Sequence, residues 1–290
     1  MLATSLDQAA ITGTARISEI RELVAGVHRR GGRVGVVPTM GALHAGHLSL
    51  MRAAREECDF VVTTIFVNPT QFGPKEDFAK YPRDLTADMQ LCAEARVDTV
   101  FHPATETVYP PGFNTFVEVS GLSDVLEGKF RPGHFRGVAT VVLKLFQMVP
   151  ADAAFFGQKD YQQQTLIRRM CADLNLPVEI RVCPTIREAD GLALSSRNVY
   201  LNADERRSAL ALSQTLQLAR KLVGEGVEPA EIRRQMLEHL KSVPFVQPDY
   251  ATLAHPDTLD ETDALLPKQV ALIAAKVGAT RLIDNCVIER

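Results

Sequence analysis

The sequence lacks an excess of charge of either sign, since 32 Lys and Arg residues face 35 Asp and Glu residues, for a formal net charge of −3 over 290 residues. This balance argues against a protein that binds nucleic acid or a membrane surface through bulk charge. The sequence also lacks a repeat of fixed period, which argues against solenoids and propellers. Hydrophobic residues make up 46% and charged residues 23%, as is typical of a soluble chain with a packed core.

Signals for export or membrane insertion are lacking as well. The first 20 residues have no basic start followed by an apolar run, so we expect no secretory signal. The most apolar stretch, 138–149, is interrupted by Lys144 and Gln147 and is too short to cross a bilayer. No C-x-x-C pair occurs, and the odd number of cysteines predicts buried small hydrophobic residues in a reducing compartment. We therefore expect a cytoplasmic protein. The cysteines are Cys58, Cys92, Cys171, Cys183 and Cys286.

Strands and helices alternate over the first 185 residues. Apolar runs predict strands over 34–37, 60–67, 97–101, 153–156 and 178–183, and helical periodicity predicts helices over 17–27, 45–57, 83–95, 138–149 and 161–174. This alternation predicts an α/β fold with a doubly wound parallel sheet. The remainder reads as a loop over 188–198, helices over 203–223 and 229–240, and strands over 250–253, 270–274 and 280–283. We expect two domains, 1–186 with the sheet and 187–290 as a smaller α+β domain.

The densest motif is the segment 38–47, PTMGALHAGH, between the first apolar strand and the next helix. In a doubly wound sheet this is where nucleotides bind, because strand ends and helix N-termini meet there. Gly41 and Gly46 allow the backbone to approach a phosphate closely, and His44 and His47 can donate hydrogen bonds to phosphate oxygens. Such donors stabilise charge that develops on a leaving pyrophosphate.

Other interpretations of this motif are weaker. The glycine spacing matches a P-loop, but His47-Leu48 stands where Lys and Ser or Thr belong, and no G-x-G-x-x-G follows the first strand. His44 and His47 are spaced as a metal pair can be, yet no carboxylate or cysteine lies close by to complete a site. A glycine turn with two solvated histidines is the plain alternative, which the position between strand and helix disfavours.

Polar motifs follow two more predicted strands. Asn68-Pro69-Thr70-Gln71 ends the 60–67 strand, and the Gln71 amide suits the hydroxyl and carboxylate groups of a small acid; a simple Asn-Pro turn is the alternative. The segment 157–160, GQKD, opens a helix, where Lys159 suits a phosphate, Asp160 a ribose hydroxyl, and Gln163 the same ligand. A helix start capped by Asp160 is compatible with this but leaves Lys159 unexplained.

Three loops complete the candidate site. Leu194-Ser195-Ser196-Arg197 offers two hydroxyls and a guanidinium to triphosphate oxygens, although a serine-rich linker is the alternative. The segment 73–82 combines glycine, proline and alternating charges, which suggests a mobile cover over the site. The segment 128–151 contains basic residues and no acidic residue. We assign no individual roles to Lys129, Arg131, His134 or Arg136 in this segment.

Taken in order, these motifs resemble the pantothenate synthetase (pantoate-beta-alanine ligase) family over nearly the whole chain. The resemblance rests on PTMGALHAGH at 38–47, IFVNPTQF at 65–72, GQKD at 157–160 and LSSRN at 194–198. The H-x-G-H element alone would indicate only the wider nucleotidyltransferase superfamily, which has a Rossmann-like fold. The family commonly has Glu where Gln158 stands here.

The resemblance implies a two-step ligation. The pantoate carboxylate attacks the α-phosphorus of ATP to form pantoyl adenylate and pyrophosphate, and the amine of β-alanine then displaces AMP. Mg²⁺ accompanies ATP, with no protein ligand assigned to it, and the family implies a homodimer. No nucleic acid or membrane partner is expected.

The resemblance also implies residue roles. His47 is the principal catalytic histidine with His44 beside it, Gln71, Gln163 and Asn68 bind substrate, and the loop carrying Arg197 closes over ATP. The implied ATP-binding residues are Met40, Gly41, Ala42, Leu43, His44, Ala45, Gly46, His47, Gly157, Gln158, Lys159, Asp160, Ile186, Leu194, Ser195, Ser196 and Arg197.

Two other functions remain open from the sequence. One is an adenylyltransferase of the same superfamily with a different acceptor, and the other is a non-catalytic nucleotide-binding regulator. Gln71 and Gln163 favour the ligase over the first alternative, because the superfamily motif does not require them. The retention of both histidines, Lys159 and Arg197 argues against the second.

Overall fold

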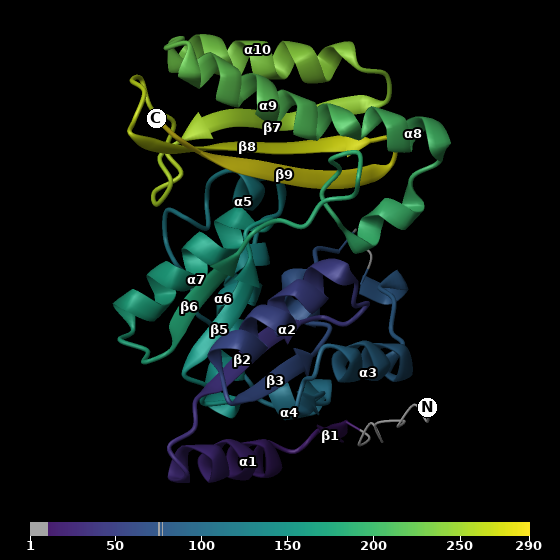
Figure 1. Ribbon diagram of the computed structural model, residues 1–290, viewed down its shortest axis with the longest axis vertical. Helices are drawn as coiled ribbons and strands as arrows, with labels where there is room; N and C mark the ends of the chain where they lie inside the picture. The colour runs from purple at the N-terminus through teal and green to yellow at the C-terminus, as the bar shows by residue number, and fades with distance from the viewer. Residues whose placement is uncertain (1–10, 75, 77) are drawn as a thin grey trace, which may run out of the picture.

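The computed structural model describes residues 11–74, 76 and 78–290, and in this part six strands form one parallel sheet in the order β1-β4-β3-β2-β5-β6 (Figure 1). The doubly wound parallel sheet expected from the sequence is confirmed. The described residues do not include 1–10, on which the expectation of no secretory signal partly rests. They also do not include residues 75 and 77 of the expected cover segment. The strands are β1 (Thr12–Thr14), β2 (Val34–Thr39), β3 (Phe60–Ile65), β4 (Thr99–Phe101), β5 (Ala153–Gly157) and β6 (Glu179–Cys183).

The direction of winding reverses between β2 and β5. After β2 the chain places β3 and β4 on one side, and it later returns to place β5 and β6 on the other. The two strands pair directly, with Gly35 opposite Ala153 and Val36 opposite Ala154. Ligands of open parallel sheets bind beyond the carboxyl ends of the strands at such a reversal. The loops after β2 and β5 therefore meet where a ligand is expected.

Helices cover both faces of this sheet. Val36 of β2 and Val62 of β3 join the apolar cluster that includes α1, α6 and α7, whereas Val37 and Val61 join the cluster that includes α2 and α3. Because successive strand residues face opposite sides, burial on both faces accounts for the uninterrupted apolar runs. The helices are α1 (Ile17–Arg29), α2 (Ala45–Glu57), α3 (Leu85–Glu94), α4 (Thr105–Val108), α5 (Glu127–Phe130), α6 (His134–Met148) and α7 (Tyr161–Asp173).

The C-terminal part forms a three-stranded antiparallel sheet in the order β7-β8-β9, with α9 and α10 over one face (Figure 1). In β8, Ala271 and Ile273 join the apolar cluster of these helices, while Val270 and Leu272 join the core of the larger sheet. The middle strand thus packs in both directions and anchors the two parts to each other. The elements are α8 (Ala203–Ser208), α9 (Leu210–Gly224), α10 (Pro229–Ser242), β7 (Val246–Ala254), β8 (Lys268–Val277) and β9 (Thr280–Glu289).

Some local predictions were wrong. The helix expected over 203–223 is interrupted at Ala209, because the Leu212 N–H bonds to the Ala209 carbonyl in a tighter three-residue turn. Strand β7 begins four residues early, at Val246, in a partly polar stretch without an apolar run. Cys183 and Cys286 are only half-buried, whereas Cys58, Cys92 and Cys171 are buried.

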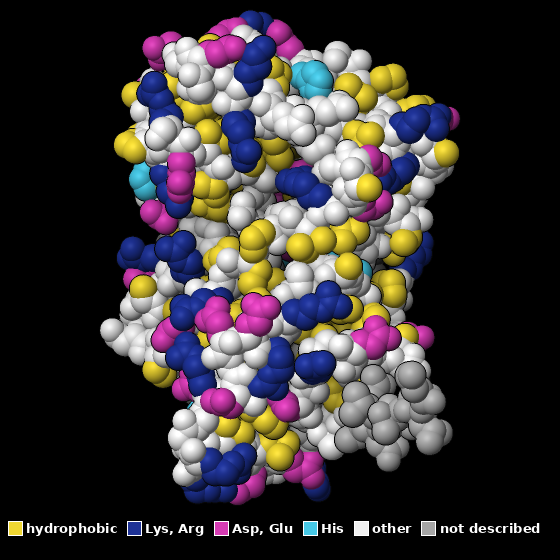
Figure 2. All heavy atoms as spheres, in the orientation of Figure 1, with side chains coloured by type: hydrophobic (Ala, Val, Ile, Leu, Met, Phe, Trp, Pro, Cys, Tyr) yellow, Lys and Arg dark blue, Asp and Glu magenta, His cyan; other side chains and the backbone are white. Residues whose placement is uncertain are grey.

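The surface agrees with the balanced composition. On the face shown in Figure 2, basic and acidic side chains are mixed over both parts of the molecule. Among the residues that the structure describes, no helix is long and apolar enough to cross a membrane.

Candidate active site

The loops after β2, β3 and β5 meet the domain-connecting loop at one cavity. Its lining combines the polar motifs with an apolar wall from α6. Gly41, Ala42, Leu43, Ala45 and Gln158 do not border it. The residues singled out from the sequence that do border it are Met40, His44, Gly46, His47, Asn68, Gln71, Gly157, Lys159, Asp160, Gln163, Ile186, Leu194, Ser195, Ser196 and Arg197.

His44 and His47 cap the N-terminus of α2 reciprocally. The Gly46 N–H donates to Nδ1 of His44 (3.1 Å), and the His44 N–H donates to Nδ1 of His47 (3.3 Å). The two rings lie with their centroids 4.1 Å apart. Because each Nδ1 accepts a backbone proton, the proton of each neutral ring lies on Nε2. The cap thus makes both Nε2 atoms hydrogen-bond donors at the positive end of a helix.

Both rings are neutral near pH 7. Burial, with a smaller effect of the adjacent His44, lowers the pKa of His47 to about 3. Burial also lowers the pKa of His44, and the Lys159 ammonium acts in the same direction. Asp160 opposes both shifts. The Lys159 ammonium acts against the charged form of both rings, so positive charge already reaches this part of the cavity.

Asp88 of α3 holds the loop before the histidines, and the sequence analysis missed it. Its buried carboxylate accepts the N–H groups of Leu43 (2.8 Å) and Ala42 (3.1 Å). Gly41 has a φ of +82°, and a Cβ there would lie 2.7 Å from Asp88 Oδ2. The Gly41 N–H donates to the Thr39 hydroxyl. The backbone donors of Gly41, Ala42 and Leu43 are thus used within the protein, and their assignment to ATP stays a prediction.

Asn68 orients Gln71. The Asn68 amide donates to Gln71 Oε1 (3.0 Å) and to the Gly137 carbonyl (3.2 Å), and its Oδ1 accepts from the Tyr109 hydroxyl (2.8 Å). Both amide protons of Asn68 are thus donated within the protein. Gln71 Nε2 lies 3.2 Å from the Met40 sulfur, a weak acceptor, and faces the cavity. Gln71 is consequently the better substrate contact of the two.

Helix α6 forms the wall beside Gln71. Gly137 lies so close to the short helix η1 (Pro69–Gln71) that a Cβ at this position would be 2.4 Å from the Thr70 carbonyl oxygen. At the start of α6, Nδ1 of the buried His134 donates to the Gln71 carbonyl (2.9 Å). The apolar lining beyond Gln71 consists of Phe66, Val138, Val141, Val142 and Leu145.

The basic stretch around α6 does not form one patch. Arg131, which follows α5, makes a bidentate ion pair with Glu76 of the expected cover segment and also contacts His134 at the start of α6 (3.0 Å). Arg136 stacks on Phe116, and Lys144 lies over Phe113. These side chains point to separate partners, so the patch adds no cation to the cavity lining.

Two short segments place a Lys and an Arg side chain at the cavity. Lys159 is half-exposed and lies in the turn between β5 and α7. Asp160 follows it at the start of α7, but its side chain makes no capping hydrogen bond. Arg197 lies in the short helix η3 (Ser196–Tyr200), whose first turn is capped by the Ser195 hydroxyl. Within the described part of the chain, no group of three or more His, Cys, Asp or Glu residues is placed to hold a metal ion.

Comparison with known proteins agrees with this geometry. A family model described as pantoate-beta-alanine ligase matches residues 13–287. Pantothenate synthetases of Moorella thermoacetica and Roseiflexus castenholzii are 54% and 52% identical to this chain, over 94% and 95% of it and 97% and 98% of their own lengths.

Solved structures show the same relationship. Pantothenate synthetase from Thermus thermophilus superposes with a TM-score of 0.90 at 46% identity, over 95% of this chain and 99% of that one. A pantoate-beta-alanine ligase from Francisella tularensis, complexed with beta-gamma ATP and beta-alanine, gives a TM-score of 0.79 at 34% identity, over 96% and 98%. The chain described here therefore belongs to the pantoate-beta-alanine ligase family of enzymes.

Proposed function

We propose that this enzyme joins pantoate to β-alanine in two steps within the cavity at the ends of β2 and β5. In the first, a pantoate carboxylate oxygen attacks the α-phosphorus of ATP, and the bond to pyrophosphate breaks. In the second, the amine of β-alanine attacks the carbonyl carbon of pantoyl adenylate, loses a proton, and AMP leaves. Atoms and charges balance without a redox partner.

The phosphate side of the site is formed by His44, His47, Lys159 and Arg197. The negative charge of the leaving pyrophosphate increases as its bond to the α-phosphorus breaks, and preorganised donors stabilise that charge. We assign the two Nε2–H groups to the phosphates because their Nδ1 atoms are fixed by the cap. Lys159 and Arg197 supply fixed positive charge from two other segments.

The observation that carries the proposal is that two amide side chains and an apolar wall border the same cavity as these donors. Gln71 ends the short helix η1 and Gln163 lies in the first turn of α7, and both border the same cavity as the histidines. Pantoate has a carboxylate, two hydroxyls and a dimethyl-substituted carbon. The two amides suit the polar groups, and the wall of Phe66, Val138 and Val142 suits the methyl groups.

Magnesium fits this site as a companion of the nucleotide. Asp160 is the one carboxylate among the described residues that line the cavity. Mg²⁺ in nucleotide sites is usually held by phosphate oxygens, waters and one or two carboxylates. Asp160 would therefore hold the ion together with the triphosphate, and the ion would neutralise part of the phosphate charge.

We further propose a boundary between a nucleotide- and pantoate-binding domain, 1–186, and a smaller domain, 187–290. The Leu194 N–H donates to the Ile186 carbonyl, and Arg187 pairs with Ala193 as an isolated bridge. The loop therefore starts in the first domain and returns to the cavity at Ser195. This supports a loop that closes over ATP.

Family membership also leads us to propose a homodimer in the cytoplasm. Light scattering of the purified protein tests the first of these proposals, since a dimer has twice the 31.9 kDa mass of the chain. Cell fractionation tests the second.

Pantoate-dependent exchange of labelled pyrophosphate into ATP tests the proposed function. The assay compares pantoate with a panel of small hydroxy acids, without β-alanine. We expect exchange with pantoate well above that with any other acid. Exchange with a different acid, and none above buffer with pantoate, would instead identify an adenylyltransferase with another acceptor.

A further inference from the structure

Two adjacent residues of the C-terminal strand β9 contact both segments that we assign to the nucleotide. Asp284 and Asn285 are each only 2% exposed, although they are polar. Buried polar groups of this kind are retained where they are hydrogen-bonded. Neither residue borders the main cavity, so their contacts indicate a role in arranging the residues that do.

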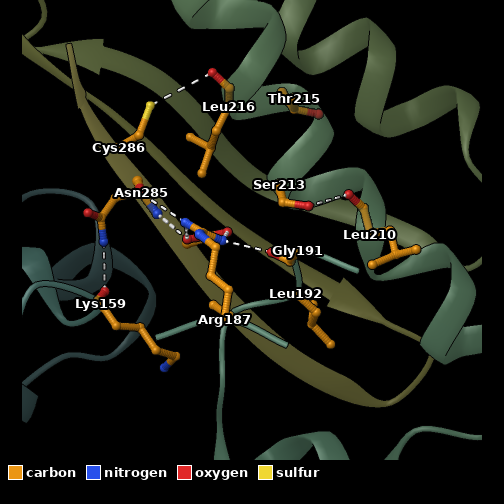
Figure 3. A network of polar contacts seen from close by, with 12 residues as sticks. Lys159, Arg187, Gly191, Leu192, Leu210, Ser213, Thr215, Leu216, Asn285 and Cys286 are labelled. Carbon is orange, nitrogen blue, oxygen red and sulfur yellow. Dashed lines mark hydrogen bonds and ion pairs between the residues drawn. The ribbon is translucent and has the colours of Figure 1, made fainter. Parts of the chain in front are cut away.

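Asn285 holds the segment after β5. Its side-chain Nδ2 donates to the carbonyl oxygen of Lys159 (2.8 Å), as Figure 3 shows. The same nitrogen donates to the carbonyl oxygen of Gln158 (3.0 Å). Its Oδ1 accepts a hydrogen bond from the side-chain Nε2 of Gln158 (3.4 Å). One side chain thus contacts two successive peptide groups of this turn. The Lys159 backbone is restrained by these contacts, while its side chain remains on the cavity.

Asp284 holds the domain-connecting loop. Its carboxylate accepts two parallel hydrogen bonds from Arg187, at 2.7 and 2.8 Å. The same guanidinium donates to the Gly191 carbonyl (3.0 Å), so it lies between the loop and β9 (Figure 3). Bidentate pairs of this kind restrict orientation as well as distance. The loop then runs through Leu194 to Ser195 and Arg197.

The pairing of β9 with β8 explains how neighbours reach different segments. Asn285 is opposite Leu272, which packs towards the larger sheet, and Asp284 is opposite Ile273, which packs towards α9 and α10. Successive strand residues face opposite sides of a sheet. One strand therefore connects to the Lys159 turn on one side and to the Arg187 loop on the other.

We propose that Asp284 and Asn285 are positioning residues that hold the Lys159 turn and the Arg197 loop in register, so that both cations reach the same nucleotide. This proposal rests on the proposed function, because that function assigns ATP to these two segments. It predicts that loss of either residue weakens nucleotide binding more than acid binding, because Gln71 is held separately by Asn68 and α6.

The test compares Asn285→Leu with the wild type. Leu is close to Asn in size but removes the donors to both carbonyls. We expect the KM for ATP and the Kd for α,β-methylene-ATP to rise about tenfold, as for a misplaced binding group, with the KM for pantoate within about twofold. Asn285→Ser gives the same readouts if the Leu variant does not fold. Asp284→Asn, which weakens the pair with Arg187, is expected to shift ATP binding in the same direction.

Asp249→Asn is the matched control. It weakens a different ion pair of the same sheet, from Asp249 Oδ2 to Arg281 Nε (2.7 Å), which touches neither nucleotide segment. We expect a lower unfolding temperature but unchanged KM values for ATP and pantoate. Unchanged ATP binding in both Asn285 variants would overturn the proposal. So would an equal rise in Asp249→Asn, which would show general loosening.

The two proposals fail differently. A wild-type enzyme that binds the ATP analogue but shows no pantoate-dependent exchange contradicts the proposed function alone. In that case the analogue Kd of the variants still decides the role of Asp284 and Asn285.

Discussion

His44 and His47 fix each other's protonation through the turn that joins them: the His44 N–H donates to Nδ1 of His47, and the Gly46 N–H donates to Nδ1 of His44. A helix cap and a candidate catalytic pair are thus the same hydrogen-bonded unit. The cap places both Nε2–H groups at the cavity, and burial keeps both rings neutral near pH 7. Substitutions that keep the helix cap made by Nδ1 but remove the Nε2–H donor can therefore test the role of each ring nitrogen.

His47→Ala is expected to lower the rate of pantoate-dependent pyrophosphate exchange by about 10²-fold or more, the scale of losing one preorganised donor at developing charge. His47→Gln places an amide near the position of Nε2 and is expected to retain more activity than Ala. His47→Asn places an acceptor near Nδ1, which preserves the cap but not the Nε2 donor.

The comparison of these variants gives the decisive result. We expect His47→Asn to unfold near the wild-type temperature while remaining as inactive as His47→Ala. A His47→Asn enzyme with nearly wild-type exchange would show that the Nε2–H group is not required.

Gly137→Ala is expected to raise the KM for pantoate about tenfold while the KM for ATP stays within about twofold, because a small displacement of a binding group has a large effect. The added Cβ would lie 2.4 Å from the Thr70 carbonyl oxygen, so α6 and η1 must separate and Gln71 must move. Ala is the better helix former, so any loss arises from this contact.

Gly224→Ala serves as its control, since a Cβ at that helix end meets nothing within 4 Å. Steady-state kinetics with each substrate varied in turn measures both variants. Equal effects on the two KM values in Gly137→Ala would contradict a role of this close approach in the pantoate pocket.

Asp88→Asn is expected to lower exchange about tenfold and stability by about 1–3 kcal/mol, because one buried backbone N–H loses its acceptor. The carboxylate now accepts from both Ala42 and Leu43, whereas an amide has a single acceptor atom. Asp84→Asn is the control on the same helix, because Asn caps α3 as well as Asp does. Wild-type exchange in Asp88→Asn would show that the loop holds its conformation unaided.

Acid is expected to destabilise the protein through His134. Burial, with a smaller effect of Arg131, lowers the folded-state pKa of His134 to about 4, from an ordinary value of 6.5. The unfolded chain therefore binds the proton first as pH falls, and the stabilisation present above pH 6.5 decreases towards pH 4. His134 alone should cost about 2 kcal/mol between pH 7 and pH 5.

Urea unfolding of wild type and His134→Asn at both pH values measures this effect. Asn keeps a donor near Nδ1 for the Gln71 carbonyl but does not titrate. The variant should lose about 2 kcal/mol less than the wild type between pH 7 and pH 5. The same pH dependence in both proteins would assign the effect to other groups, including His47, whose pKa is also lowered.

The sheet and the position of most motifs at strand ends were predictable because they depend on local patterns. Runs such as 60–67 are apolar throughout because both faces of the sheet are covered, and three of the four motifs stand at the ends of such strands. What the sequence did not show was which strands are neighbours. The pairing of β2 with β5 is what brings His47 and Lys159 to one cavity.

The residues that were missed act across long separations in the chain. Asp88 supports a loop 45 residues earlier, and Asn285 supports a turn 126 residues earlier. In the sequence, Asp88 reads as an ordinary helix carboxylate, and Asn285 lies just beyond the strand expected over 280–283. Only tertiary contacts distinguish them. Substrate binding by Asn68 stays a prediction, and the structure adds that its amide protons are donated to Gln71 and Gly137.

The adenylate pathway is tested most directly by following an oxygen atom. Pantoate labelled with ¹⁸O in its carboxylate is incubated with enzyme, MgATP and β-alanine, and the phosphate products are analysed by mass spectrometry. Attack on the α-phosphorus leaves one carboxylate oxygen on phosphorus, so the account predicts AMP that carries one ¹⁸O and pyrophosphate that carries none. Unlabelled AMP, or ADP with label in inorganic phosphate, would contradict it.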